Sequence, residues 1–149
     1  MNKAELIQKY KAILAAHAID PNDAVVILGG SLLVRDVKVN CSNLDIVVGE
    51  IQWQYFKESI VVDPTLGMLE DNGNAAYESI DLGNSVKIIA MLVEPSNIEV
   101  VDGVAIQTLE ACRNQMAMIN NPKHGYLIEP FSDEITVDFS KYDIPAVTP

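Results

Sequence analysis

Three small residues near the start of the chain form the first pattern that could support chemistry. Residues 24–28 are apolar and rich in β-branched side chains, as in a buried strand, and Gly29, Gly30 and Ser31 follow them directly. Two glycines let the backbone turn sharply and approach a ligand closely. A serine at the start of a helix offers a hydroxyl and free amides to a phosphate. We therefore treat this Gly-Gly-Ser segment as a candidate nucleotide-binding turn.

An acid on the next expected strand, Asp45, is the best candidate for a catalytic or metal-binding residue. Residues 44–48 read as a second apolar strand, and Asn43 stands just before it. A carboxylate at a strand edge can hold a divalent cation that bridges to a phosphate. Taken alone, this pattern is weak evidence for a nucleotide site, because a Gly-Gly turn between a strand and a helix can also have a purely structural role.

In this order, the residues resemble the nucleotidyltransferase fold, the superfamily of polymerase-β-like and minimal nucleotidyltransferases. The family pattern is a hydrophobic strand, Gly-Gly or Gly-Ser, a spacer, and then Asp-hydrophobic-Asp on the next strand. Here Gly30-Ser31 fits the first part, and Asn43-Leu44-Asp45 occupies the paired-acid position. The resemblance implies that Gly29, Gly30 and Ser31 hold the phosphates of a nucleotide.

A second match lies later in the chain. Many family members carry a hairpin with Gly-Val, a Leu-Glu-Ala helix and a closing Arg-Pro-Lys-Asp. This sequence has corresponding residues at 103–104, 109–111 and 121–124, where Asn-Pro-Lys-His replaces the closing motif. The resemblance thus extends over residues 25–125, and it implies that Lys123 neutralises phosphate charge.

The departures from the family pattern concern the metal ligands. The family's paired acids hold two magnesium ions, and a third acid on a later strand helps to activate the attacking hydroxyl. Here the first acid is Asn43, a poorer magnesium ligand, and the strand expected at 85–93 offers only Lys87 among apolar residues. We expect that Asp45 alone remains, unless the loop at 70–71 or the acids at 78 and 81 replace the missing carboxylates.

Three functions follow from this comparison. The first is a degenerate member that binds a nucleotide, a protein partner or a second copy of itself. The second is an active enzyme that moves a nucleotidyl group from a nucleoside triphosphate to a hydroxyl, with magnesium held by Asp45 and Asn43. The third is an acidic decoy that docks on a basic protein. We expect the first, because losing two carboxylates removes several kcal/mol of transition-state stabilisation.

Net charge and cysteine content further restrict the kinds of partner and the cellular compartment that we expect. The chain has 149 residues and a formal net charge of −11, so direct binding to nucleic acid or to an anionic membrane is not expected. Two cysteines without a CxxC pattern are typical of reduced intracellular thiols. The N-terminal residues lack the apolar core of a signal peptide. We therefore expect a cytoplasmic protein.

The elements that must position these residues indicate an α/β fold, with a mixed β-sheet flanked by helices and a nucleotidyltransferase-like core. We expect one domain over residues 1–128 and an acidic extension over 129–149, which holds five acids and one lysine. Periodicity and turn residues predict helices at 3–18, 32–39 (with Ser31 as N-cap), 52–59 and 108–120, and strands at 24–28, 44–48, 60–63, 77–82, 85–93, 98–101, 104–106 and 135–139.

Overall fold

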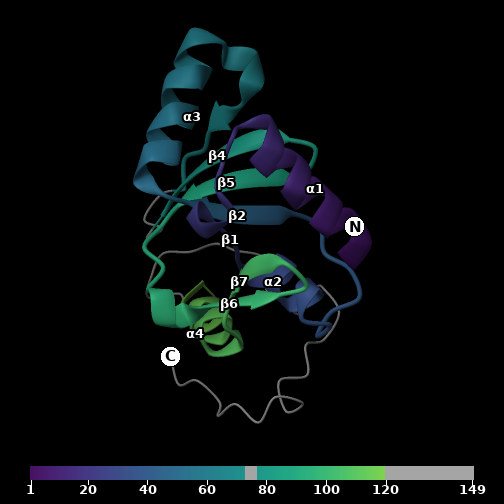
Figure 1. Ribbon diagram of the computed structural model, residues 1–149. Coiled ribbons are helices and arrows are strands. Elements are labelled where there is room, and N and C mark those ends of the chain that lie inside the picture. Colours follow the sequence, from purple (N-terminus) through teal and green to yellow (C-terminus); the bar gives the residue numbers. More distant parts are fainter. Residues whose placement is uncertain (73–76, 120–149) are drawn as a thin grey trace.

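A computed structural model describes residues 1–72 and 77–119 of the chain (Figure 1). These residues form an α/β fold in which helices flank a mixed sheet of order β3-β4-β5-β2-β1-β7-β6. The strands are β1 (Ala24–Val26), β2 (Leu44–Val48), β3 (Met68–Leu69), β4 (Glu78–Gly83), β5 (Val86–Ala90), β6 (Ile98–Val101) and β7 (Val104–Gln107). The helices are α1 (Lys3–Ala16), α2 (Leu28–Val34), α3 (Glu50–Val62) and α4 (Leu109–Ile119), with 3₁₀ turns η1 (Pro21–Asp23), η2 (Pro64–Leu66) and η3 (Pro95–Asn97).

The centre of the sheet joins segments that are far apart in the sequence. Strand β2 pairs antiparallel with β1 and parallel with β5, and β1 pairs parallel with β7. Two antiparallel hairpins, β4-β5 and β6-β7, complete the two sides. Their two-residue turns are Asn84-Ser85 and Asp102-Gly103, where the backbone takes the positive φ that such turns require. The mixed sheet predicted from the sequence is therefore confirmed.

Each face of the sheet carries its own apolar core. Alternate side chains of a strand point to opposite faces, so Leu44 and Ile46 of β2 join a core with α1 and α3, whereas Val47 joins a second core with α2 and α4. Figure 1 shows α1 lying along the sheet and α3 extending beyond it. In the part of the chain that the structure describes, no helix has the length and apolar content that a membrane crossing needs.

The first predicted helix is confirmed, and the structure explains where it begins. The Asn2 side chain accepts a hydrogen bond from the Glu5 backbone N–H, and the Glu5 carboxylate accepts one from the Asn2 N–H. This capping box satisfies two backbone groups that a helix start would otherwise leave unpaired. At the start of helix α4, the Thr108 hydroxyl accepts a hydrogen bond from the Ala111 N–H.

Two predicted elements are wrong. The helix expected at 32–39 begins at Leu28 and ends at Val34, so Ser31 lies inside the helix rather than at its N-cap, which is Ile27. The chain turns earlier than the glycines suggest because Leu28 itself takes a positive φ of 54°, and its backbone N–H donates to the Gln107 side chain. A partner 79 residues away therefore sets this boundary.

The strand expected at 60–63 is the last turn of α3. Ile60 is partly buried and packs on the first core, while Val61 and Val62 are exposed, so three β-branched residues lie in a helix although their β-propensity favours a strand. The helix ends where Asp63 caps η2 and Pro64 follows. The strand expected at 135–139, the domain boundary at 128, the acidic extension 129–149 and Lys123 lie outside the described residues.

Candidate functional site

The Gly-Gly-Ser segment lies in the first turn of α2, shortly after β1 ends at Val26, so it is helical and not the turn between strand and helix that the sequence predicted. The structure also brings Asp45 to this turn, because the Ile27 N–H donates to the Asp45 backbone oxygen at 3.1 Å. Ser31, however, is fully buried, and its Oγ donates to the Leu28 carbonyl at 2.6 Å. The serine hydroxyl is therefore used inside the protein and does not face a ligand.

The two glycines have different surroundings. A Cβ on Gly30 would lie 2.7 Å from Val26 Cγ1 and 3.3 Å from Leu6 Cδ1, closer than atoms can approach without a shift. Gly30 therefore lets α2 pack directly on β1 and α1. A Cβ on Gly29 would instead lie 3.4 Å from Lys38 Nζ, at the end of a flexible side chain. Lys38 is buried beside the glycines, although it belongs to no motif in the sequence.

Arg35 closes the other end of α2 and is engaged in internal contacts. Its guanidinium forms an ion pair with Glu99 of β6 and donates to the Gln107 carbonyl of β7 at 3.0 Å. Because these contacts join the short helix to the β6-β7 hairpin, Arg35 has a structural role here.

Asp45 is half-buried on the face of the sheet that carries the second core, and its cross-strand neighbour is a lysine. The register pairs Asp45 of β2 with Lys87 of β5, and Lys87 in turn with Asp81 of β4. Residues opposite each other in a sheet point to the same face about 5 Å apart. Asn43 is exposed and precedes β2. On β5, the two side chains on the Asp45 face are those of Lys87 and Ile89.

Glu70 completes this row of charges. Its carboxylate lies 3.2 Å from Lys87 Nζ and accepts a hydrogen bond from the buried Ser79 hydroxyl at 2.9 Å. The Asn72 side-chain amide in turn donates to Ser79 Oγ at 2.8 Å. Glu70, which the sequence suggested as a replacement metal ligand, thus forms an ion pair with the Lys87 ammonium group. Among residues 1–72 and 77–119, no three His, Cys, Asp or Glu side chains are grouped so that they could hold a metal ion.

Cys112 of α4 lies against the start of α2 but is not a nucleophile. Its Sγ is 3.7 Å from the Leu28 carbonyl oxygen, and burial raises the pKa of the thiol to about 11. At neutral pH the group is therefore the unreactive thiol rather than the thiolate. Cys41 and Cys112 are both buried and free, in agreement with the expectation of reduced cysteines.

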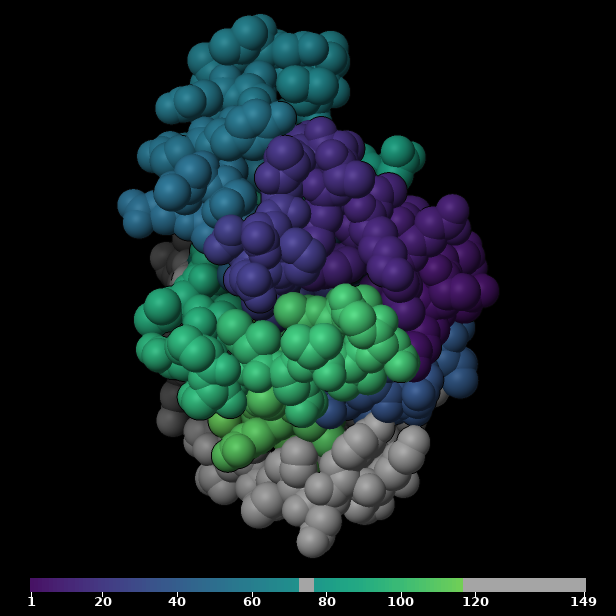
Figure 2. All heavy atoms as spheres, viewed as in Figure 1, coloured from purple at the N-terminus to yellow at the C-terminus, as the bar shows by residue number. Residues whose placement is uncertain are grey.

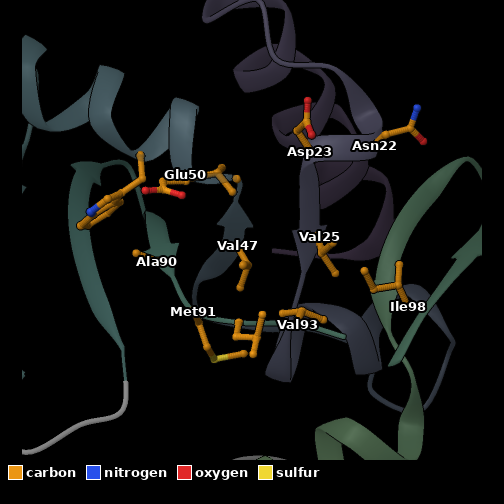
Figure 3. Close-up of a pocket in the computed structure, with 13 residues that line it drawn as sticks. Asn22, Asp23, Val25, Val47, Glu50, Ala90, Met91, Val93 and Ile98 are labelled. Atoms are coloured by element: carbon orange, nitrogen blue, oxygen red, sulfur yellow. The ribbon is translucent and has the colours of Figure 1, made fainter. Parts of the chain in front are cut away.

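A pocket of about 470 Å³ lies at the other end of β1 and β2, away from the Gly-Gly-Ser segment (Figure 3). It opens between the start of β1, the end of β2, the residues that follow β5 and the start of β6. Its lining residues are Asn22, Asp23, Val25, Val47, Val48, Gly49, Glu50, Trp53, Ala90, Met91, Leu92, Val93 and Ile98. Sequence reasoning missed this pocket because its residues come from separate segments that carry no common motif.

Replacing Gly30 by alanine is expected to lower the free energy of unfolding by about 1–2 kcal/mol, because overpacking costs about 1–3 kcal/mol and alanine regains part through helix propensity. Urea denaturation followed by circular dichroism measures this change. Gly29→Ala is the matched control, since its Cβ would make contacts at ordinary van der Waals distances, 3.4 Å from Lys38 Nζ and 3.8 Å from Cys41 Cβ. Equal losses in both variants would contradict the packing role of Gly30.

Lys87 and Glu70 are expected to stabilise the protein as a pair. A double-mutant cycle with Lys87→Met and Glu70→Gln should give a coupling energy of about 0.5–1 kcal/mol, as for a partly exposed ion pair. Urea denaturation of the four proteins measures it. A cycle of Lys11→Met with Glu70→Gln is the control, because Lys11 is an exposed residue of α1. The ion pair is refuted if both cycles give the same coupling.

Comparison with known proteins adds one structural match. No family model matches the chain, and no curated protein matches it. The crystal structure of JHP933 from Helicobacter pylori superposes with a TM-score of 0.48 at 13% sequence identity, and the match covers 88% of this chain. The chain spans about 62% of the length of that protein.

Proposed function

We propose that the protein has a nucleotidyltransferase-type fold, has lost metal-dependent nucleotidyl transfer and acts by binding a partner. The observation that carries this proposal is the pairing of Asp45 with Lys87 across β2 and β5. The family resemblance of the Gly-Gly-Ser segment and of the Leu109-Glu110-Ala111 helix start supports the fold.

The residues around Asp45 do not fit a centre with two magnesium ions. Such a centre needs several carboxylate oxygens that converge on the metals. Asn43 is neutral, and the neighbouring strand supplies an ammonium where the family would supply an acid. A lysine beside Asp45 repels a divalent cation and already balances part of the acidic charge of Glu70. We therefore derive no step of phosphoryl transfer from this site.

The Gly-Gly-Ser segment also fits a structural role better than a phosphate cradle. The Ser31 hydroxyl donates to a backbone carbonyl, and Gly30 is used for close packing. With both groups engaged inside the fold, the segment offers a nucleotide few of the contacts that the sequence suggested. Of the binding functions expected for a degenerate member, we therefore favour binding to a protein over binding to a nucleotide.

Helix α3 supports a function through protein contacts. Ile51 in the first turn of the helix and Val61 and Val62 in its last turn are each at least 80% exposed. Figure 2 shows this helix projecting from the rest of the described surface. Exposed apolar groups on a projecting element are typical of an interaction surface.

Incubation with labelled nucleoside triphosphates and Mg²⁺ or Mn²⁺ tests the loss of catalysis. We expect that the wild-type protein transfers no label to itself or to added hydroxyl acceptors, because the residue opposite Asp45 on β5 is Lys87 rather than an acid. Transfer by the wild type that Asp45→Ala abolishes would instead establish an active nucleotidyltransferase.

Restoring the acids should restore metal binding. In the variant that combines Asn43→Asp with Lys87→Asp, Mn²⁺ at a few times its Kd should add about 1 kcal/mol of stability and raise the midpoint of thermal unfolding by about 2–4 °C. The wild type should show no such rise. Asn40→Asp with Lys11→Asp is the control of equal charge at exposed positions. Equal shifts in the two variants would show that the position of the acids is irrelevant.

A further inference from the structure

The pocket at the other end of β1 and β2 combines an apolar floor with an acidic rim. Val25 and Val47 lie side by side on the second-core face of the sheet, and Met91, Val93 and Ile98 continue this apolar surface. Figure 3 shows these side chains below Asp23 and Glu50, which lie at the same end of the pocket. A volume of about 470 Å³ is in the ordinary range for a small-molecule site.

The backbone holds the two carboxylates on this rim. The Gly49 N–H donates to the Asp23 backbone oxygen at 3.2 Å, which ties η1 to the start of α3. The Gln52 side-chain amide donates to Asp23 Oδ2 at 3.3 Å, and this neutral partner leaves the charge of the carboxylate uncompensated. The Glu50 side chain forms no hydrogen bond or ion pair with residues 1–72 and 77–119.

The charge of the rim selects the ligand. Among the described residues that line the pocket, two are acids and none is lysine, arginine or histidine. An anionic ligand would meet Asp23 and Glu50 without a compensating cation, although the N-terminal end of α3 is close. A cation gains from both carboxylates, and its hydrocarbon part can cover the valines of the floor.

We propose that this pocket binds a small organic amine, with its ammonium group between Asp23 and Glu50 and its hydrocarbon chain on the apolar floor. Neither the Gly-Gly-Ser segment nor Asp45 lines this pocket, and its function does not depend on whether the protein transfers nucleotides. The two proposals can therefore fail independently of each other.

Trp53 allows a direct test, because it lines the pocket and is the sole tryptophan of the chain. Titration with octylammonium, octanol and octanoate compares one hydrocarbon chain carrying three head groups. We expect octylammonium to give a saturable change in fluorescence and to raise the midpoint of thermal unfolding. Octanol should bind more weakly, and octanoate about tenfold more weakly or not at all, since its charge is repelled.

Matched variants separate the pocket from the general attraction of an acidic protein for cations. Glu50→Gln and Asp23→Asn should each weaken octylammonium binding about threefold to fivefold, the effect of losing a partly exposed ion pair. Glu58→Gln, which removes an exposed acid of α3 that does not line the pocket, should leave the affinity unchanged.

Three results would overturn the proposal. The first is an octanoate affinity equal to that of octylammonium. The second is an equal affinity of Glu50→Gln, Asp23→Asn and Glu58→Gln for the amine. The third is the absence of both a fluorescence change and a thermal shift at octylammonium concentrations up to about 10 mM, beyond which binding is negligible.

Discussion

The parallel pairing of β2 with β5 is the constraint on which the rest of the molecule depends. It joins residues 44–47 to residues 86–89 and so connects the N-terminal part of the chain to the β4-β5 hairpin. A slip by one residue would turn Leu44 and Ile46 out of the first core, so burial holds the register. The same register places Lys87 opposite Asp45. The chemistry of this site is therefore a consequence of core packing.

The turn between β1 and α2 is subject to a second constraint. Leu28 takes a left-handed backbone conformation, which costs about 1 kcal/mol or more for a residue other than glycine. Its N–H is bonded to Gln107, and its carbonyl accepts a hydrogen bond from Ser31. These contacts offset the strain and direct the serine hydroxyl inward. The segment resembles a phosphate-binding turn in sequence, but in the structure it packs α2 against β1 and α1.

Local patterns were sufficient for the elements whose boundaries are set locally. The first helix, the strand at 44–48 and both hairpins follow from spacing and turn residues, because caps and turns act within a few residues. Local patterns predicted the wrong helix start at residues 28–34 and the wrong element at residues 60–62. In the first case a hydrogen bond from the Leu28 N–H to the Gln107 side chain fixes the helix start, and in the second the packing of the partly buried Ile60 on the first core outweighs β-propensity.

By itself, the sequence determined the fold class, indicated free cysteines, and placed Asp45 on the strand that follows the Gly-Gly-Ser segment. These features depend on residue type and on order along the chain. Only the tertiary structure decided that Lys87 is the neighbour of Asp45, that Glu70 turns to that lysine, and that Asp23 and Glu50 share a pocket rim. The physical reason is that pairing register and the meeting of distant segments come from the burial of two cores, which no local pattern encodes.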